Sequence, residues 1–406
     1  MNIGVYFHTN DDCLSGVEYY ALGLIHALMR HGAEHRYTIF TNRPGMVLQA
    51  EADVRIVPAK HGQSRVRRIV WEHTVLPRLA NRERVDVLHC PAYICPVAFT
   101  RVPCVVTIHD TVALDHPRWC KPTNAAYYRL MLGRAARKAA RIVAVSAETA
   151  RSICRHVDAG GRIRVVRPGI DAIFHESADL GDVRARYGLP AGLHGKLHTN
   201  HHGVPWSERP ADVDRSAPGP ATVLAVARLV PKKGLDHLVR AMADVVRKGI
   251  PCRLVIAGDG PQRRQLAELA ERLGVAGCVR FTGWQDQAGV GRLLRSATIL
   301  AVPSVIAADG DRDGIPNVIL EAFAAGVPVV ATRLPGIGEA IEHDTTGVLV
   351  EPGNADGLAR AIESLLADEA LRHRLATAAW EAGRARFDLC VNARGISELL
   401  KEAHAC

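Results

Sequence analysis

Asp313-Gly-Ile-Pro-Asn-Val-Ile-Leu-Glu321-Ala-Phe-Ala-Ala-Gly326-Val-Pro-Val-Val-Ala-Thr332 is the stretch of this chain that decides the fold. A proline suits the first turn of a helix, where no amide hydrogen is needed, and a helical run follows it. The pattern predicts a helix from Asn317 to Ala325, which Gly326 ends. The β-branched residues after it predict a strand. A loop, a helix and a strand in this order indicate an α/β domain.

The same stretch carries the residue types of an anion-binding site. Gly314 lets the backbone approach a ligand closely. The free amides at the helix start carry about half a positive charge and attract anions. Glu321 lies on the first turns of this helix, within reach of a hydroxyl group on the molecule that carries the anion. We therefore expect a phosphate at the helix start and a sugar near two acids; an ordinary loop, helix and strand is the alternative.

Strands and helices alternate in both halves of the chain. In the first half, apolar runs predict strands at 3–7, 37–40, 54–57, 86–90, 105–109 and 142–146, and helical patterns occupy 17–30 and 123–140. The alternation restarts at 222, with strands predicted at 222–227, 253–257, 279–282, 299–302 and 327–332. Short apolar runs between helical patterns indicate parallel strands in doubly wound sheets.

The chain length and the break in this alternation set the domain boundaries. A chain of 406 residues suggests two domains. We expect a first domain at 1–178 and a second at 221–385. Residues 179–220 are rich in Gly, His, Pro and Asp, so we expect a linker with a surface insertion there. The last segment, 386–406, is predicted to be a helix.

Composition narrows the class of protein. Hydrophobic residues make up 48% of the chain, which is typical of a globular protein. No apolar run is long enough to span a membrane, and the first residues lack the pattern of a secretory signal, so we expect a cytoplasmic protein. The ten cysteines form no C-x-x-C pair and are expected to be reduced thiols. The net charge of +9 favours anionic partners, but aromatic residues are few and no nucleic-acid motif occurs.

Three further positions carry chemistry. His109 and Asp110 end a predicted strand, where polar residues face a ligand cleft. Arg228 and Lys233 follow the first strand of the second half, and their charges can hold a diphosphate. Gly16 opens a helix after the first strand, which is weak evidence of a ligand turn. Structural roles for these residues are the alternative in each case.

These phrases together resemble the retaining glycosyltransferases of family 4, which have the GT-B fold. The family pattern is Glu, seven residues, Glu, with Gly after the first acid; here Asp313 stands at the first acid and Glu321 at the second. The phrase from Arg228 to Gly234 matches the family spacing of Arg, Lys and Gly, and the phrase around His109 is also similar.

The resemblance extends over nearly the whole chain. It implies an α/β architecture of two Rossmann-like doubly wound domains facing a central cleft, with the acceptor on the first domain and the nucleotide-sugar donor on the second. The last helix is then expected to cross back to the first domain.

The resemblance also implies the roles of the site residues. His109, Asp313 and Glu321 are expected at the reaction centre, with His109 orienting the donor sugar. The residues expected to bind the donor are Gly16, Arg228, Lys233, Gly314, Ile315, Asn317, Val318 and Glu321. We expect no cofactor and no divalent metal, because Arg228 and Lys233 can neutralise the diphosphate. The acidic residues Asp309 and Asp311 beside Asp313 leave a cation as the alternative.

A basic and apolar run covers residues 65–84, with Arg65, Arg67 and Arg68 at its start. Such a run suits an anionic membrane surface or a lipid-diphosphate acceptor, and a solvated helix face is the alternative. A second basic stripe, at 134–141, is more typical of an ordinary surface.

The expected function is the transfer of a sugar, with retention of configuration, from a nucleotide-sugar to a glycan or lipid-linked acceptor. A bacterial surface or exopolysaccharide pathway fits best, and the protein is expected in the cytoplasm or at the inner face of the membrane. No nucleic acid is expected as a partner. The alternatives are a GT-B nucleotide-sugar epimerase or phosphorylase, or a nucleotide-sugar binding protein without catalysis.

Overall fold

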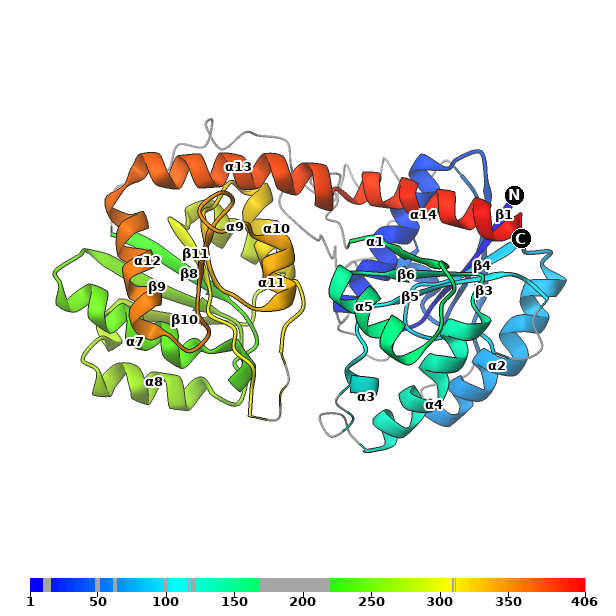
Figure 1. Ribbon diagram of the computed structural model, residues 1–406, viewed down its shortest axis with the longest axis horizontal. Helices are drawn as coiled ribbons and strands as arrows, with labels where there is room; N and C mark the ends of the chain where they lie inside the picture. Colours follow the sequence, from blue (N-terminus) through cyan, green and yellow to red (C-terminus); the bar gives the residue numbers. More distant parts are fainter. Residues whose placement is uncertain are drawn as a thin grey trace. The chain divides into compact units, whose positions relative to one another are not determined.

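The computed structural model describes residues 1–9, 16–47, 52–60, 64–97, 101–115, 117, 122–167, 220–308, 310 and 312–405. The chain forms two compact units: the first contains β1 to β7 and the last helix, and the second contains β8 to β13 (Figure 1). Almost all of the predicted insertion at 179–220 lies outside the described residues, and so do Asp309 and Asp311.

The first unit contains a parallel sheet in the order β3-β2-β1-β4-β5-β6-β7. Its strands are β1 (Asn2–Phe7), β2 (Arg36–Thr41), β3 (Asp53–Pro58), β4 (Val87–Cys90), β5 (Cys104–Ile108), β6 (Arg141–Ala144) and β7 (Ile163–Val165). Its helices are α1 (Gly16–His31), α2 (Arg65–Arg82), α3 (Val112–Asp115), α4 (Pro122–Lys138), α5 (Ala147–His156) and α14 (Leu389–His404). Residues of β4, β5 and β6 are almost all buried, because helices cover both faces of a parallel sheet.

The second unit contains a parallel sheet in the order β10-β9-β8-β11-β12-β13. Its strands are β8 (Ala221–Val226), β9 (Cys252–Ala257), β10 (Val279–Gly283), β11 (Ile299–Val302), β12 (Val329–Thr332) and β13 (Val348–Val350). The α-helices are α7 (Leu235–Arg247), α8 (Arg263–Arg272), α9 (Gln287–Ser296), α10 (Asn317–Ala324), α11 (Pro335–Ala340), α12 (Ala355–Ala367) and α13 (Glu369–Phe387). A single 3₁₀ turn, η5 (Pro231–Lys233), precedes α7.

The prediction of two doubly wound, Rossmann-like parallel sheets is confirmed. The strand β11 matches its predicted range, and most other predicted strands differ from the observed ones by one or two residues at their ends. The edge strands β7 and β13 were not predicted, since each has only three residues, too few for a periodic pattern.

The last two helices divide between the units. Helix α13 belongs to the second unit up to Arg386, and the chain from Phe387 onward belongs to the first. Helix α14 packs against α1 in the first unit, and its apolar residues Leu389, Ile396 and Leu400 lie in the core that α1 shares with the sheet. An ion pair between Arg141 of β6 and Glu402, with 3.0 Å from Nε to Oε2, adds a polar contact at the end of α14.

Each sheet reverses its strand order at one point. In the first sheet the reversal falls between β1 and β4, and in the second between β8 and β11. In each pair, the loops that leave the carboxyl ends of the two neighbouring strands run in opposite directions, which opens a crevice at the sheet edge. Ligands of doubly wound sheets bind in this crevice, so the strand order marks one candidate site in each unit.

Candidate functional site

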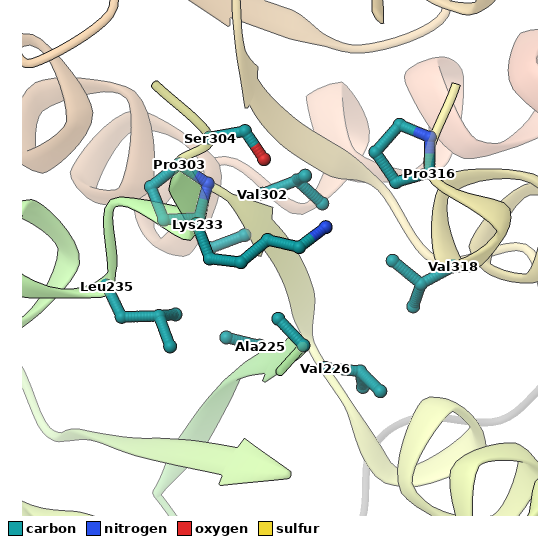
Figure 2. Close-up of a pocket in the computed structure, with 11 residues that line it drawn as sticks. Ala225, Val226, Lys233, Leu235, Val302, Pro303, Ser304, Pro316 and Val318 are labelled. Carbon is teal, nitrogen blue, oxygen red and sulfur yellow. The ribbon is translucent and has the colours of Figure 1, made fainter. Parts of the chain in front are cut away.

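The second unit has a pocket at its reversal point. The residues that line it come from the ends of β8 and β11 and from the segments around η5 and the start of α10 (Figure 2). They are Ala225, Val226, Ala227, Lys233, Leu235, Ala301, Val302, Pro303, Ser304, Pro316 and Val318. The lining is mostly apolar, and the ammonium group of Lys233 extends across it (Figure 2). A cation in an apolar crevice at a reversal point is suited to an anionic ligand.

Lys233 and Asp313 meet beside this pocket. The Nζ of Lys233 donates to Oδ2 of Asp313 at 2.7 Å, and Ser304 Oγ donates to the same oxygen at 2.5 Å. The Nζ of Lys232 lies 3.7 Å from the other carboxylate oxygen. The Asp313 side chain is only 8% exposed, so these charge-assisted contacts act with little competition from water. Two lysines around one carboxylate leave a net positive charge of one at the pocket.

Close packing between two loops holds Lys233 in place. Gly234 has a left-handed backbone, with φ of 56°, and a Cβ at this position would lie 2.1 Å from the carbonyl oxygen of Pro303. Glycine is therefore required for the loop after β8 to touch the loop after β11. The backbone amide of Val305 also donates to the Lys232 carbonyl at 2.8 Å. Thr332 Oγ1 donates to the Ser304 carbonyl and fixes Ser304 from the side of β12.

The predicted donor-binding residues after Asp313 lie where the loop becomes α10. Gly314 is exposed, Ile315 and Asn317 are partly buried, and Val318 lines the pocket. Glu321 is 6% exposed on the second turn of α10. Pro316 precedes the first helical residue, so the helix begins at the predicted position.

Gly336 supports the acidic loop from behind. A Cβ on Gly336 would lie within 2.6 Å of three backbone atoms of Gly314, so only glycine fits at this contact. The start of α11 therefore sets the position of the Gly314 backbone.

Arg228 lies two residues after the carboxyl end of β8. Its neighbour Leu229 is fully buried, and the Leu229 amide donates to the Asp259 carbonyl at 2.9 Å. The backbone is thus fixed, while the Arg228 side chain is exposed to solvent. Arg228 and Lys233 leave the same strand and lie on one loop, as predicted from their spacing.

The first unit places His109 directly after β5. Its Nε2 lies 2.8 Å from the Pro91 carbonyl oxygen. A carbonyl can only accept, so Nε2 carries the proton and Nδ1 is the acceptor of the neutral ring. Burial lowers the pKa of His109 below its ordinary value, against the opposing effects of the Pro91 carbonyl and Asp110. The ring is therefore neutral near pH 7 and offers an acceptor for a hydroxyl group.

Helix α1 also contacts His109. It begins at Gly16, beyond the carboxyl end of β1, and one turn later Tyr20 contacts His109 edge-on, with ring centroids 4.9 Å apart. The predicted glycine turn and the predicted histidine thus belong to one region of the first unit.

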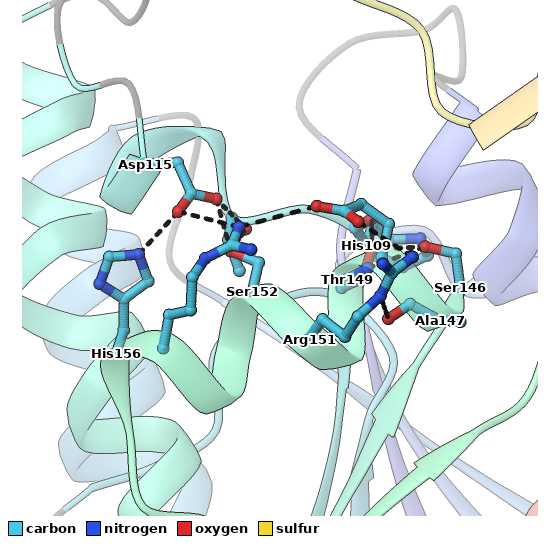
Figure 3. Close-up of polar contacts among 11 residues, drawn as sticks. His109, Asp115, Ser146, Ala147, Thr149, Arg151, Ser152 and His156 are labelled. Atoms are coloured by element: carbon cyan, nitrogen blue, oxygen red, sulfur yellow. Dashed lines mark hydrogen bonds and ion pairs between the residues drawn. The ribbon is translucent and has the colours of Figure 1, made fainter. Parts of the chain in front are cut away.

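The segment after His109 is anchored to α5 (Figure 3). Thr149 Oγ1 donates to the His109 carbonyl at 3.2 Å. Asp115 accepts hydrogen bonds from Thr111 at 2.6 Å and from Ser152 at 2.5 Å, and His156 Nε2 lies 2.7 Å from its other oxygen. Burial raises the pKa of Asp115, but these hydrogen bonds outweigh burial and hold that pKa below its ordinary value. The ionised carboxylate ties α3 to α5 and so fixes the exit of the strand.

Sequence reasoning did not find several residues of these sites. Ser304, Lys232 and Gly336 act on Asp313 or Gly314 only through tertiary contacts, and Tyr93 contacts His109 from a separate loop. The Val302-Pro-Ser304 phrase at a strand end was the available signal for Ser304. Among the described residues no cluster of three or more His, Cys, Asp or Glu could hold a metal ion.

Two family models match the chain, one on each half. Residues 14–173 match the model described as Glycosyltransferase Family 4, and residues 210–381 match the one described as Glycosyl transferases group 1.

Several curated relatives are similar to part of the chain. The lipopolysaccharide core biosynthesis glycosyltransferase LpsE of Rhizobium meliloti is 39% identical over 41% of this chain and 45% of its own length. The putative colanic acid biosynthesis glycosyltransferase WcaL of Escherichia coli is 35% identical over 43% and 45%. The chain thus spans about half the length of the curated relatives that it matches.

Solved structures agree with the fold along the whole chain. The Anabaena protein Alr3699/HepE, solved in complex with UDP, has a TM-score of 0.68 to this chain at 19% identity, over 99% of this chain and 100% of that one. A glycosyltransferase family model matches each half, and each half is built on one doubly wound parallel sheet. The chain therefore has the GT-B fold, and each of its halves is similar to a family of glycosyltransferases.

Proposed function

We propose that this protein is a retaining glycosyltransferase that moves a sugar from a nucleotide-sugar donor to a glycan or lipid-linked acceptor in bacterial surface or exopolysaccharide synthesis. The observation that carries the proposal is the pocket at the reversal point of the second sheet, with the Lys233 ammonium in it and Asp313 on that ammonium. The relatives named for lipopolysaccharide core and colanic acid biosynthesis support the pathway.

In the second unit, we assign the diphosphate of the donor to Arg228 and Lys233. Arg228 offers a planar pair of donors and Lys233 a point charge, and both lie on the loop after β8. As the bond to the sugar breaks, negative charge develops on the leaving diphosphate, and fixed cations stabilise it. The UDP complex of the HepE structure supports a nucleoside diphosphate as the ligand of this fold.

The acids at Asp313 and Glu321 contact the two sugars of the donor in this proposal. The Asp313 carboxylate, in the loop before α10, accepts hydrogen bonds from hydroxyl groups of the transferred sugar. The Glu321 carboxylate, on α10, accepts them from the ribose. Both carboxylates are largely buried, where hydrogen bonds to hydroxyl groups are stronger than in water. We expect no divalent metal, because Lys232, Lys233 and Arg228 supply the positive charge that a metal would otherwise bring.

His109 of the first unit orients the donor sugar in this proposal. Its neutral ring, protonated on Nε2, leaves Nδ1 to accept a hydrogen bond from a sugar hydroxyl. We do not assign it as a general base, because burial lowers the pKa of His109 below its ordinary value and so makes Nδ1 a weak proton acceptor. The departing phosphate then accepts the proton of the acceptor hydroxyl.

A screen of nucleotide-sugars by thermal shift, followed by transfer assays, tests the proposal. We expect one nucleoside diphosphate to raise Tm, and a product whose anomeric configuration, read by NMR, equals that of the donor. Conversion of the donor without acceptor would indicate an epimerase instead. Tight binding without turnover on any glycan or lipid acceptor would indicate a binding protein. An inverted anomeric centre would overturn the retaining mechanism.

The acceptor side carries a surface that suits an anionic membrane. Helices α2 and α4 lie together, because Tyr127 Oη of α4 donates to Glu72 of α2 at 3.5 Å and the Arg65 guanidinium lies 5.4 Å from the Tyr127 ring centroid. Apart from Asn81 and Thr123, the side chains of the two helices that the structure describes as exposed are basic or apolar: Val66, Arg67, Val70, Arg78, Arg82, Ala126, Arg129, Leu130, Arg134, Arg137 and Lys138. Basic residues around exposed valine and leucine are typical of a peripheral membrane contact.

Co-sedimentation with vesicles tests this surface. No helix among the described residues is long and apolar enough to cross a bilayer. We expect binding to vesicles that contain phosphatidylglycerol and none to pure phosphatidylcholine. Replacing Arg67 and Arg134 with glutamate should abolish binding, whereas replacing Arg247 and Arg264 of the second unit with glutamate should not. Equal binding of both double variants would reject this surface.

A further inference from the structure

Tyr93 has an unfavourable backbone conformation next to the candidate reaction centre. Its φ is 59°, in the left-handed region, which is unfavourable for a bulky residue. The conformation is held by a hydrogen bond from the Tyr93 amide to the Thr107 carbonyl in β5, at 2.8 Å. Such strain is retained where the surrounding contacts impose it, and these contacts lead to His109.

The Tyr93 side chain contacts both His109 and Asp110, the next residue in the chain. Its Oη donates to Asp110 Oδ2 at 2.6 Å, and its ring centroid lies 5.4 Å from that of His109. The other oxygen of Asp110 accepts from the Val112 amide at 3.1 Å, at the start of α3. Both carboxylate oxygens of Asp110 thus accept hydrogen bonds from the protein, and Asp110 connects Tyr93 to the start of α3.

His109 is held by the same loop that carries Tyr93. The Pro91 carbonyl fixes the proton on Nε2, and the rings of Tyr93 and Tyr20 flank the imidazole. A shift of the 91–93 loop would therefore move the carbonyl acceptor and one aromatic wall together. The tautomer and the direction of Nδ1 both depend on this loop.

We propose that Tyr93 is a positioning residue, which fixes the tautomer and the orientation of His109 through its hydroxyl bond to Asp110 and its ring contact. The proposal rests on the proposed glycosyl transfer and adds a residue to it. Tyr93 itself need not touch the donor. The strained backbone keeps the Pro91 carbonyl and the Tyr93 ring on the same imidazole.

Two variants and a control test the proposal. Tyr93→Phe removes only the hydroxyl, and Tyr93→Ala also removes the ring. Tyr128→Phe is the matched control, because the Tyr128 ring packs on Tyr93 with centroids 5.6 Å apart. We expect kcat to fall about tenfold in Tyr93→Phe and further in Tyr93→Ala, with unchanged nucleoside diphosphate affinity and unchanged Tm in Tyr93→Phe and Tyr128→Phe. The control should keep the wild-type kcat.

NMR of the His109 ring gives a readout that does not depend on transfer. In the wild type we expect the Nε2-protonated tautomer and a pKa below the ordinary value, and in Tyr93→Ala a pKa closer to that value because water reaches the ring. This result distinguishes failure of the positioning role from failure of the proposed function. A wild-type His109 tautomer and pKa in Tyr93→Ala would overturn the proposal even if transfer is lost. Equal losses of kcat in Tyr93→Phe and Tyr128→Phe would also overturn it.

Discussion

In our proposal the Lys233 ammonium binds the Asp313 carboxylate in the free protein and the diphosphate when the donor binds. Replacing Asp313 with asparagine tests whether the carboxylate and the diphosphate compete for this lysine. In the free protein the Lys233 ammonium donates to Asp313 at 2.7 Å, and Ser304 donates to the same oxygen. A diphosphate that binds Lys233 must approach with this carboxylate beside it. Asp313→Asn keeps the size of the side chain and removes its negative charge.

The magnitude follows from the charges. Two like unit charges about 6 Å apart repel by about 3 kcal/mol at an effective dielectric constant of about 20. The two lysines screen part of this repulsion, so we expect nucleoside diphosphate to bind Asp313→Asn about 1–2 kcal/mol more tightly, or about 5- to 30-fold. Transfer should nevertheless fall, because the transferred sugar loses the contact of a charged acid.

Titration calorimetry of the wild type and the variant with the nucleotide found in the screen measures the effect. Ser304→Ala is the matched control, since it removes a donor from the same carboxylate without changing the charge. We expect no tighter binding in the control. Weaker nucleotide binding in Asp313→Asn would refute the reasoning, because it would mean that the carboxylate orients Lys233 for phosphate and does not compete for it.

Three other predictions follow from single features of the structure. Arg228→Ala should weaken nucleoside diphosphate binding by about 1.5–3 kcal/mol in calorimetry, whereas the exposed Arg264→Ala should have no effect; equal affinities would place the phosphate elsewhere. Gly234→Ala should lower Tm more than Gly249→Ala, because both have positive φ but only Gly234 lies against a carbonyl; equal shifts would contradict the clash. Burial and the nearby His109 lower the pKa of His89 from 6.5 to about 3, so the folded state keeps it neutral while the unfolded state takes up a proton below pH 6.5. Urea unfolding should therefore show about 2 kcal/mol lost from this group between pH 7 and pH 5, and a smaller loss in His89→Gln; an identical slope would assign the loss to other groups.

The sequence by itself determined the class of fold and the position of most elements. The apolar runs that form β8, β9 and β11 are short, continuous and separated by helical patterns, which only a covered parallel sheet accommodates. The start of α10 at Asn317 could be read from one proline, because proline fixes its own backbone angle and needs no partner. Local chemistry was sufficient wherever the cause of a structure lay within a few residues.

Only the tertiary structure decided which side chains share a site. Lys233 and Asp313 are 80 residues apart, and they meet because β8 and β11 are neighbours in the sheet. No local pattern encodes that order, since it depends on how every helix crosses the sheet. The same is true of Tyr93, whose strained backbone is held by a hydrogen bond to Thr107 in β5 and not by its neighbours in the chain. Residue types and spacing therefore predicted the candidates, and the strand order determined their partners.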